Sequence, residues 1–436
     1  MSTYIEPTDA RPTAPSRLWA GGYPTWLVSD TSFELSSALA GFAVPLLALM
    51  VTDDPVKAGV IGAAGVGTRV VASLVGGVLA DRHNRVRMML AGAAVGLVIA
   101  LLFTWAATGS LTFTALLALN VAMAARNGLF GGATQAALKD IVPADALGRA
   151  QASNQGRDAV IALAGSPLGG VLLGLGAPVL GVVLVACQLV AAGSAALLSR
   201  WARQDVAATG PESKEGLDGP PTAPGRRFLG ELADGFRWVF SRPDLRGALL
   251  VSTLINLGFN AAVSTVVYSM QQSGSSPTVI GLVSGGLGLG MLAGALVAPI
   301  LVARVPAGRL AIGGLVLLAV GTLALPFVTH PLGITVLMAV SIAGAPALNA
   351  ALLGYFMVAT PSALIGRATG AITVFATGAM PLAPLIAGVG LGLAGRGWTL
   401  VLAAAICLAA TMLAASTRGL RELPAEAGWA AHAERQ

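Results

Sequence analysis

Twelve apolar runs, each about as long as a bilayer's hydrocarbon core is thick, dominate this sequence. A membrane-spanning helix needs about 20 mostly apolar residues. Only 11% of the residues are charged, against about a quarter in a soluble domain. We therefore expect an all-α polytopic membrane protein, with the lipid bilayer as its solvent. The expected spans are roughly 26–50, 57–80, 88–106, 112–137, 152–174, 179–199, 246–269, 278–302, 309–328, 332–356, 368–393 and 398–416.

The basic residues predict how these spans are oriented. When the twelve spans alternate in direction, one side holds both termini and the loops with Arg82, Lys139 and Arg304, while the other side holds only Lys57 and Arg396. Lys and Arg concentrate in cytoplasmic loops. The pattern predicts a multi-pass protein of the cell (inner) membrane with both termini in the cytoplasm. The net charge of +6 then reflects topology, which argues against nucleic acid as a partner.

One long polar stretch, residues 201–227, divides the spans six and six and has the Pro, Gly and charge content of a flexible linker. After it, 228–242 places apolar residues at helical spacing. It is either an amphipathic helix at the membrane surface or an extension of the seventh span. The expected organisation is a cytoplasmic tail (1–25), a six-helix half (26–200), a cytoplasmic linker with an amphipathic helix (201–245), a second six-helix half (246–416) and a cytoplasmic tail (417–436).

The two halves also repeat each other in sequence. "VPADALGRAQAS" contains Pro143 and Arg149, and "TPSALIGRATGA" contains Pro361 and Arg367, at positions larger by 218. Each segment leads into a span rich in small residues, around Pro167 in the first half and Pro384 in the second. Repeated six-helix units predict pseudo-symmetric halves with a binding site between them near the bilayer midplane.

The loop between the second and third spans carries a recognisable pattern. "GGVLADRHNRVRMM" resembles the signature loop of the major facilitator superfamily. With "LKDIVPADALGRAQA" and "LADGFRWVFSRPDLR", it is similar to the drug and siderophore exporter branch, which includes the enterobactin exporter and macrolide efflux proteins. The resemblance implies the major facilitator fold and a cytoplasmic latch that stabilises the outward-facing state. The latch residues would be Gly77, Asp81, Arg82, Arg85 and Arg87.

Exporters of that branch also carry Gly-Pro-x-x-Gly-Gly in the fifth span. Here the stretch reads Gly165-Ser166-Pro167-Leu168-Gly169-Gly170, with the proline one place late. Proline removes a backbone donor and glycine allows close helix packing. We therefore expect Gly165, Pro167, Gly169 and Gly170 to form a hinge.

Ionisable residues inside spans are costly and usually functional. The expected candidates for proton coupling or substrate binding are Asp30, Glu34, Arg69, Arg126, Arg157 and Asp158. Helical rise places Glu34 and Arg69 within reach of each other, and Asp158 and Arg126 less closely. No Asp or Glu occurs between Asp244 and Glu422, so a carboxylate that couples transport to protons belongs to the first half.

Two plainer interpretations stay open for these charges. Thr31 to Glu34 fits a capping box, in which case the first span would begin at Thr31 and Glu34 would lie at the interface. The balanced acids and bases could also form structural pairs that never change protonation.

The second half offers amides and aromatic residues in place of charges, a composition that favours an amphipathic organic substrate. The cavity candidates are Asn256, Asn260, Tyr268 and Tyr355, with Phe259, Met291, Asn349 and Phe375 as weaker ones. The three histidines lie far apart, and no phosphate-binding glycine loop or metal-ligand spacing occurs. We expect neither an enzyme nor a bound cofactor.

The first hypothesis is a monomeric, proton-driven secondary exporter of an amphipathic drug, siderophore or secondary metabolite. An importer or facilitator of a zwitterionic or anionic solute is the alternative with the same fold. A sensor or scaffold that transports nothing is the third hypothesis, and the short tail after Arg418 argues against it.

Overall fold

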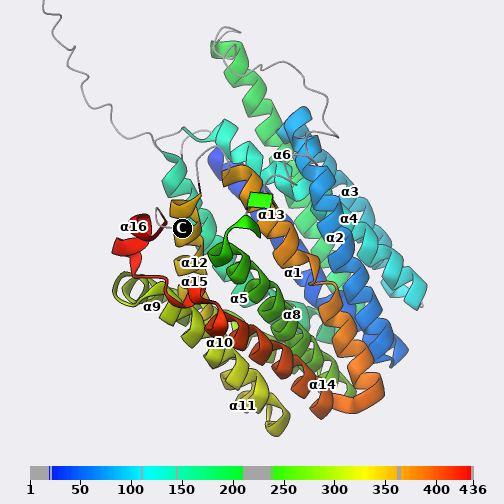
Figure 1. Ribbon diagram of the computed structural model, residues 1–436. Helices are drawn as coiled ribbons and strands as arrows, with labels where there is room; N and C mark the ends of the chain where they lie inside the picture. Colours follow the sequence, from blue (N-terminus) through cyan, green and yellow to red (C-terminus); the bar gives the residue numbers. More distant parts are fainter. Residues whose placement is uncertain are drawn as a thin grey trace, which may run out of the picture.

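A computed structural model describes residue 19 and residues 22–109, 111–143, 146–209, 237–238, 240–360 and 365–433. The regular elements of these residues are all helical (Figure 1). They are α1 Tyr23–Thr52, α2 Pro55–Arg82, α3 Arg85–Thr108, α4 Phe113–Ile141, α5 Leu147–Leu175, α6 Ala177–Thr209, α8 Pro243–Gln272, α9 Pro277–Arg304, α10 Ala307–Ala324, η3 Leu325–Phe327, α11 Pro331–Ile342, α12 Ala345–Ala359, α13 Ile365–Gly378, α14 Leu382–Ser416, α15 Arg418–Arg421, η4 Glu426–Gly428 and α16 Trp429–Ala433.

Eleven helical segments of the described residues are long and apolar enough to cross a membrane, and the last of them accounts for two crossings. That segment, Ile372–Ser416, has 45 residues, or about 68 Å at ~1.5 Å per residue, roughly twice the hydrocarbon thickness of a bilayer. Its helix turns at Gly395, where φ is 74°, a value that favours glycine. The expected twelve-span, all-helical fold is therefore confirmed.

Short polar caps set the helix boundaries at both ends of the bundle. The Asp54 carboxylate accepts hydrogen bonds from the backbone N–H groups of Val56 and Lys57, and Pro55 occupies the first turn of α2. Asn84 caps α3 in the same way by accepting from the Arg87 N–H, at 3.0 Å.

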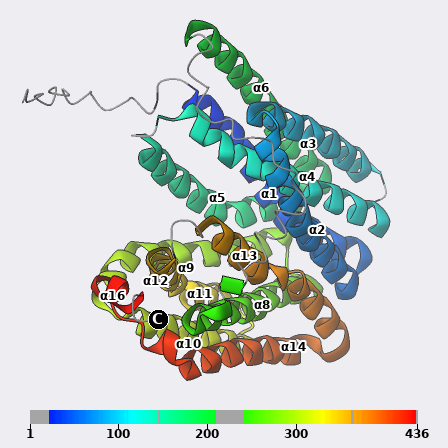
Figure 2. The same cartoon turned by 45° about the horizontal axis from the view of Figure 1, so that its top comes forward.

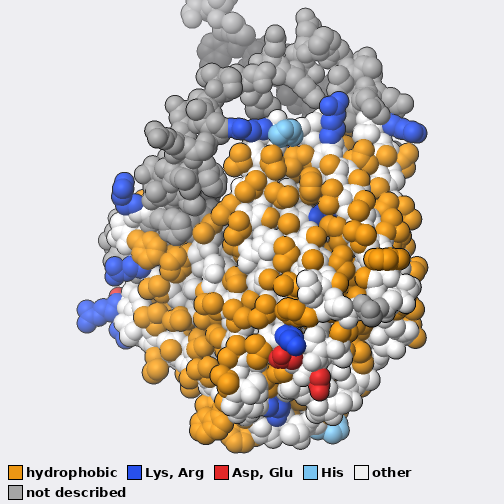
Figure 3. All heavy atoms as spheres, turned by 90° about the vertical axis from the view of Figure 1, so that its right-hand side faces the viewer, with side chains coloured by type: hydrophobic (Ala, Val, Ile, Leu, Met, Phe, Trp, Pro, Cys, Tyr) orange, Lys and Arg blue, Asp and Glu red, His pale blue; other side chains and the backbone are white. Residues whose placement is uncertain are grey.

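The helices alternate in direction and give the bundle two chemically different ends. The end with Arg82, Arg85, Lys139 and Arg304 is here called the basic end. The opposite end, with the α1–α2 turn at Asp54, is called the far end. Apolar side chains cover most of the surface between the two ends, and Lys and Arg side chains gather along its upper and left edges in Figure 3.

Helices α1–α6 form one half of the bundle and α8–α14 form the other (Figure 2). The largest apolar core contains residues of both halves, such as Leu46 and Ile61 with Tyr268 and Ala387. The other cores are each confined to one half and lie toward the basic end. The halves are thus joined at the far end and packed separately at the basic end.

The connection between the halves differs in part from the sequence expectation. Helix α6 continues through Thr209, so the chain is still helical past 201, where the linker was expected to begin. The rest of the expected linker and most of the expected amphipathic helix, residues 210–236 and 239, lie outside the described residues.

Candidate functional site

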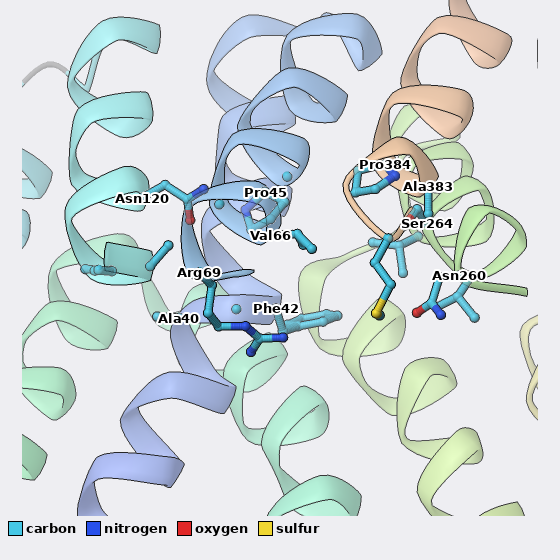
Figure 4. Close-up of a pocket in the computed structure, with 18 of the residues that line it drawn as sticks. Ala40, Phe42, Pro45, Val66, Arg69, Asn120, Asn260, Ser264, Ala383 and Pro384 are labelled. Carbon is cyan, nitrogen blue, oxygen red and sulfur yellow. The ribbon is translucent and has the colours of Figure 1, made fainter. Parts of the chain in front are cut away.

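A cavity of about 330 Å³ lies between the two halves, beneath the far-end core. Helices α1, α2 and α4 line it from the first half, and α8, the α13–α14 turn and the first turn of α14 line it from the second (Figure 4). Its walls are Ser37, Ala40, Gly41, Phe42, Pro45, Gly62, Gly65, Val66, Arg69, Asn120, Met123, Ala124, Asn127, Asn260, Val263, Ser264, Val267, Tyr268, Met380, Ala383 and Pro384.

Two glycine crossings join the halves toward the far end. Gly59 of α2 packs on Gly388 of α14, and a Cβ added to Gly388 would lie 3.0 Å from the Gly59 Cα. Gly170 of α5 packs on Gly281 of α9, and a Cβ added to Gly170 would lie 2.9 Å from the Gly281 Cα. A methyl group fits at neither crossing, so the helices meet backbone to backbone.

The two crossings are pseudo-symmetric copies of each other. Gly170 and Gly388 differ by 218 positions, the same offset that relates Pro143 to Pro361. In each copy a proline packs on a further glycine of the opposite half: Pro167 on Gly285 and Pro384 on Gly62. Of the expected hinge residues of α5, Pro167 and Gly170 therefore lie at this contact, whereas Gly165 and Gly169 pack within the first half, against Ala38 and Phe42 of α1.

The cavity wall is mostly apolar, with a few polar side chains held by local hydrogen bonds. The Asn120 amide donates to the Ile61 carbonyl at 2.7 Å, and the Asn127 amide donates to the Ser37 hydroxyl at 2.9 Å. Across the cavity, the Asn260 amide donates to the Asn256 carbonyl at 2.8 Å. The Tyr268 hydroxyl reaches the other half and donates to the Ala58 carbonyl at 3.3 Å.

Of the four cavity candidates in the second half, the structure places Asn260 and Tyr268 in the wall. Asn256 instead donates to the Ser252 hydroxyl within α8, at 3.4 Å. Tyr355 is buried in the second-half core, where its ring contacts His432. Phe259 is also buried in that core, and Met291 and Asn349 are exposed outside the cavity wall. Phe375 packs on Phe240.

Three charges join α1 to α5 at one ion cluster. The Arg157 guanidinium lies 2.5 Å from the Asp30 carboxylate and 2.7 Å from the Asp158 carboxylate. Asp30 is 1% exposed and Asp158 is 50% exposed in this cluster, so one acid is buried and the other meets solvent. The prediction that Asp158 pairs with Arg126 is wrong, because Asp158 forms its ion pair with the adjacent residue, Arg157.

Glu34 lies on α1 one turn after Asp30 and is half-buried. Helix α1 begins at Tyr23, so Thr31 lies within the helix and the capping-box interpretation is wrong. Glu34 precedes Ser37 and Gly41 on the face of α1 that lines the cavity. The expected ion pair with Arg69 is not formed among the described residues, although Arg69 is near enough to attract Glu34 electrostatically.

Arg126 is the buried cation of the first half, at 4% exposed. Its guanidinium donates to the Gly92 carbonyl at 2.9 Å, to the Asn127 Oδ1 at 3.0 Å and to the Gln188 Oε1 at 2.7 Å. Its face lies 3.9 Å from the Phe33 ring centre. Neutral acceptors and an aromatic ring thus replace a carboxylate, and they tie together α1, α3, α4 and α6.

Comparisons with known proteins identify the family. The model of the Major Facilitator Superfamily matches residues 31–271, more than half of the chain. This chain belongs to the major facilitator superfamily. No curated protein matches it. Among solved structures, it is similar to the nucleoside transporter NupG, at 13% identity and a TM-score of 0.63, over 90% of this chain and 100% of that one. It is equally similar to a D-xylose–proton symporter, at 14% identity and a TM-score of 0.63, over 93% and 98% of the two chains.

In the part of the signature loop that the structure describes, Arg85 of this major facilitator protein makes its contacts within one half. The Arg85 guanidinium donates to the Asp140 carboxylate at 2.8 Å and to the Ala136 carbonyl at 3.3 Å, both on α4. Arg82 and Arg87 are exposed, and a Cβ on Gly77 would meet nothing within 4 Å. The side chain of Asp81, the acidic residue of the expected latch, lies outside the described part of the structure.

Proposed function

We propose that this major facilitator protein is a proton-coupled exporter of an amphipathic small molecule, within the drug and siderophore exporter branch. The observation that carries the proposal is the cavity between the halves, whose wall is mostly apolar with a few amides and one cation. Its volume of about 330 Å³ falls in the range of small-molecule sites, about 300–1,000 Å³.

The arrangement of the two ends supports alternating access. The halves share a core at the far end and have separate cores at the basic end. With the basic end in the cytoplasm, this is the inward-facing state. The latch residue Arg85 pairs within its own half, as expected when a latch between the halves is released. Rocking of the halves would open the two glycine crossings and expose the cavity to the outside.

The acids of α1 and α5 supply the proton sites. Asp158 is half-exposed and Glu34 is half-buried on the cavity-lining helix, so both are accessible in a state open at the basic end. Asp30 is buried against Arg157 and would exchange a proton only when this cluster opens. The part of the second half that the structure describes contains no acid between Leu245 and Arg421, so it offers no competing site.

Reconstituted vesicles test the proposal. A panel of fluorescent amphipathic compounds is loaded, a pH gradient is imposed, and an entrapped pH dye reports proton flux. We expect gradient-driven efflux in the wild type and a fall of about tenfold or more in Glu34→Gln and Asp158→Asn. The matched control is Glu422→Gln, which removes an exposed acid of the tail. Undiminished efflux in both Glu34→Gln and Asp158→Asn would overturn the proton-site assignment.

Uptake of an anionic solute is the second candidate, and Arg69 favours it. Unprotonated Glu34 attracts Arg69 electrostatically and so competes with a bound anion. Protonation of Glu34 removes this competition, so an anion and a proton would bind together and travel in the same direction. Sidedness separates the two candidates. In vesicles oriented like the cell, an exporter expels solute against its concentration difference while protons flow inward. An importer in the same vesicles accumulates solute from the outer side.

A further inference from the structure

We infer that the cavity binds an organic anion, with the acidic group of the substrate held by Arg69 and its apolar body against the remaining wall. The inference rests on the proposed function only in taking this cavity as the substrate site. It holds for export and for uptake alike, and it names the substrate class that the proposed function leaves open.

The charge of the wall is the first argument. Arg69 is the only Lys, Arg, His, Asp or Glu among the described residues that line the cavity. A site inside the membrane has a low dielectric, so a cation that no acid contacts directly attracts anions strongly and repels cationic amphiphiles. A wall with one cation and no acid is therefore complementary to a molecule with one negative group.

The free state of Arg69 is the second argument. Arg126 and Arg157 both have their guanidinium groups bound by protein, the first by three acceptors and the second by two carboxylates. Within the described residues Arg69 has neither a hydrogen bond nor an ion pair, and its side chain is exposed in the cavity. Its planar fork of N–H donors is thus available to a carboxylate, sulfonate or phosphate in bidentate geometry.

The layout of the wall gives the orientation of the substrate. Arg69 enters from α2, whereas Asn260 and Ser264 lie across the cavity on α8 (Figure 4). Apolar residues occupy the wall between them, including Phe42, Val66 and Pro384. A substrate whose acidic group meets Arg69 would place its apolar body along these residues and a neutral polar group near Asn260.

A matched set of fluorescent probes tests the inference by binding to the purified protein in nonionic detergent. Dansylglycine carries a carboxylate, its primary amide is neutral, and dansylcadaverine is a cation with the same fluorophore. We expect dansylglycine to bind about tenfold or more tightly than the amide, because a hydrogen-bonded charge contact contributes ~1.5–3 kcal/mol, equivalent to that factor. The cationic probe is expected to bind most weakly.

Variants connect the preference to Arg69. Arg69→Gln should reduce dansylglycine affinity to that of the amide, and Arg69→Lys should keep part of the preference. Arg418→Gln removes an exposed cation of the tail and should leave the preference unchanged. Size-exclusion elution of each variant checks folding, and Arg69→Lys keeps the test open if Arg69→Gln fails to fold.

Equal binding of the three probes, a preference for the cation, or an unchanged anion preference in Arg69→Gln would overturn the inference. These outcomes are separable from failure of the proposed function. A proton-coupled transporter of cations passes the vesicle experiment and fails this one, whereas a transporter of anions without proton coupling does the reverse.

Discussion

The two halves share a backbone plan but divide the chemistry unequally. The first half contains the Asp30–Arg157–Asp158 cluster and the buried Arg126 network. The described spans of the second half hold their buried polar groups mainly by hydrogen bonds to nearby backbone carbonyls, as Thr411 does with Cys407. Both halves contribute equally to the glycine crossings. The two halves are therefore symmetric at the glycine crossings, where they close against each other, and asymmetric in their buried charged residues.

The largest effect is expected from the buried cation of the first half. Arg126→Met leaves the buried acceptors at Gly92 and Gln188 without a donor, and each unsatisfied buried acceptor costs about 1–3 kcal/mol. We expect a clearly lower unfolding midpoint in denaturant titrations of the purified protein. Thr411→Val, the matched removal of a buried polar group from the second half, should cost about 0.6 kcal/mol. Equal costs would break the comparison between the halves.

The glycine crossings should respond symmetrically. Gly170→Leu and Gly388→Leu each overpack one crossing, at a cost of about 1–3 kcal/mol to the closed far end. We expect both to shift the population toward an open far end by similar factors. Fluorescence energy transfer between dyes on Lys57→Cys and Ser273→Cys measures this, in a chain whose Cys187 and Cys407 are replaced by Ser. A shift in only one variant would show that the crossings are not equivalent.

A smaller effect is expected from the hydrogen bond that joins the halves. Tyr268→Phe removes the donor to the Ala58 carbonyl and should weaken far-end closure by about 0.5–1.5 kcal/mol. The same dye pair should report a population shift smaller than that of either leucine variant. Tyr355→Phe, in the core of the second half, is the matched control and should leave the dye distance unchanged.

The smallest effect is expected at the signature loop. Arg85→Gln breaks a partly exposed ion pair with Asp140, and such pairs contribute about 0–1 kcal/mol. In this state the variant should therefore unfold almost like the wild type. A loss of stability as large as that of Arg126→Met would show that the loop supports the first half as strongly as its buried network does.

Hydropathy was sufficient to predict the spans, because length and apolarity are properties of each segment alone. The positions of Lys and Arg in the sequence were likewise sufficient to distinguish the two ends of the helix bundle. The pairing of charges could not be predicted in the same way. Rise along a helix gives the depth of Glu34, Arg69 and Asp158, but the direction in which each side chain points depends on how helices are rotated against each other. Depth alone paired Asp158 with Arg126 and left Asp30 without a partner, whereas in the structure Arg157 forms ion pairs with both acids.

Neutral residues were the second source of error. Arg126 satisfies its charge with Gln188 and Asn127, which a tally of ionisable residues passes over. Asn120 and Asn127 stand seven positions apart on α4, a spacing that places them on one helical face. This pattern was the available signal for the cavity wall. Gln188, isolated in an apolar run of the sixth span, was the signal for the partner of Arg126.

The single cation in the cavity also bears on how membrane voltage acts on the protein. Exchange of one monovalent anion outward for one proton inward moves two positive charges inward, worth about 4.6 kcal/mol per 100 mV. Joint movement of the same anion and proton moves no net charge and is indifferent to voltage. An anion bound by Arg69 would therefore make proton-coupled export electrically driven and proton-coupled uptake electrically silent, and a potassium diffusion potential across a vesicle would distinguish the two without a pH gradient.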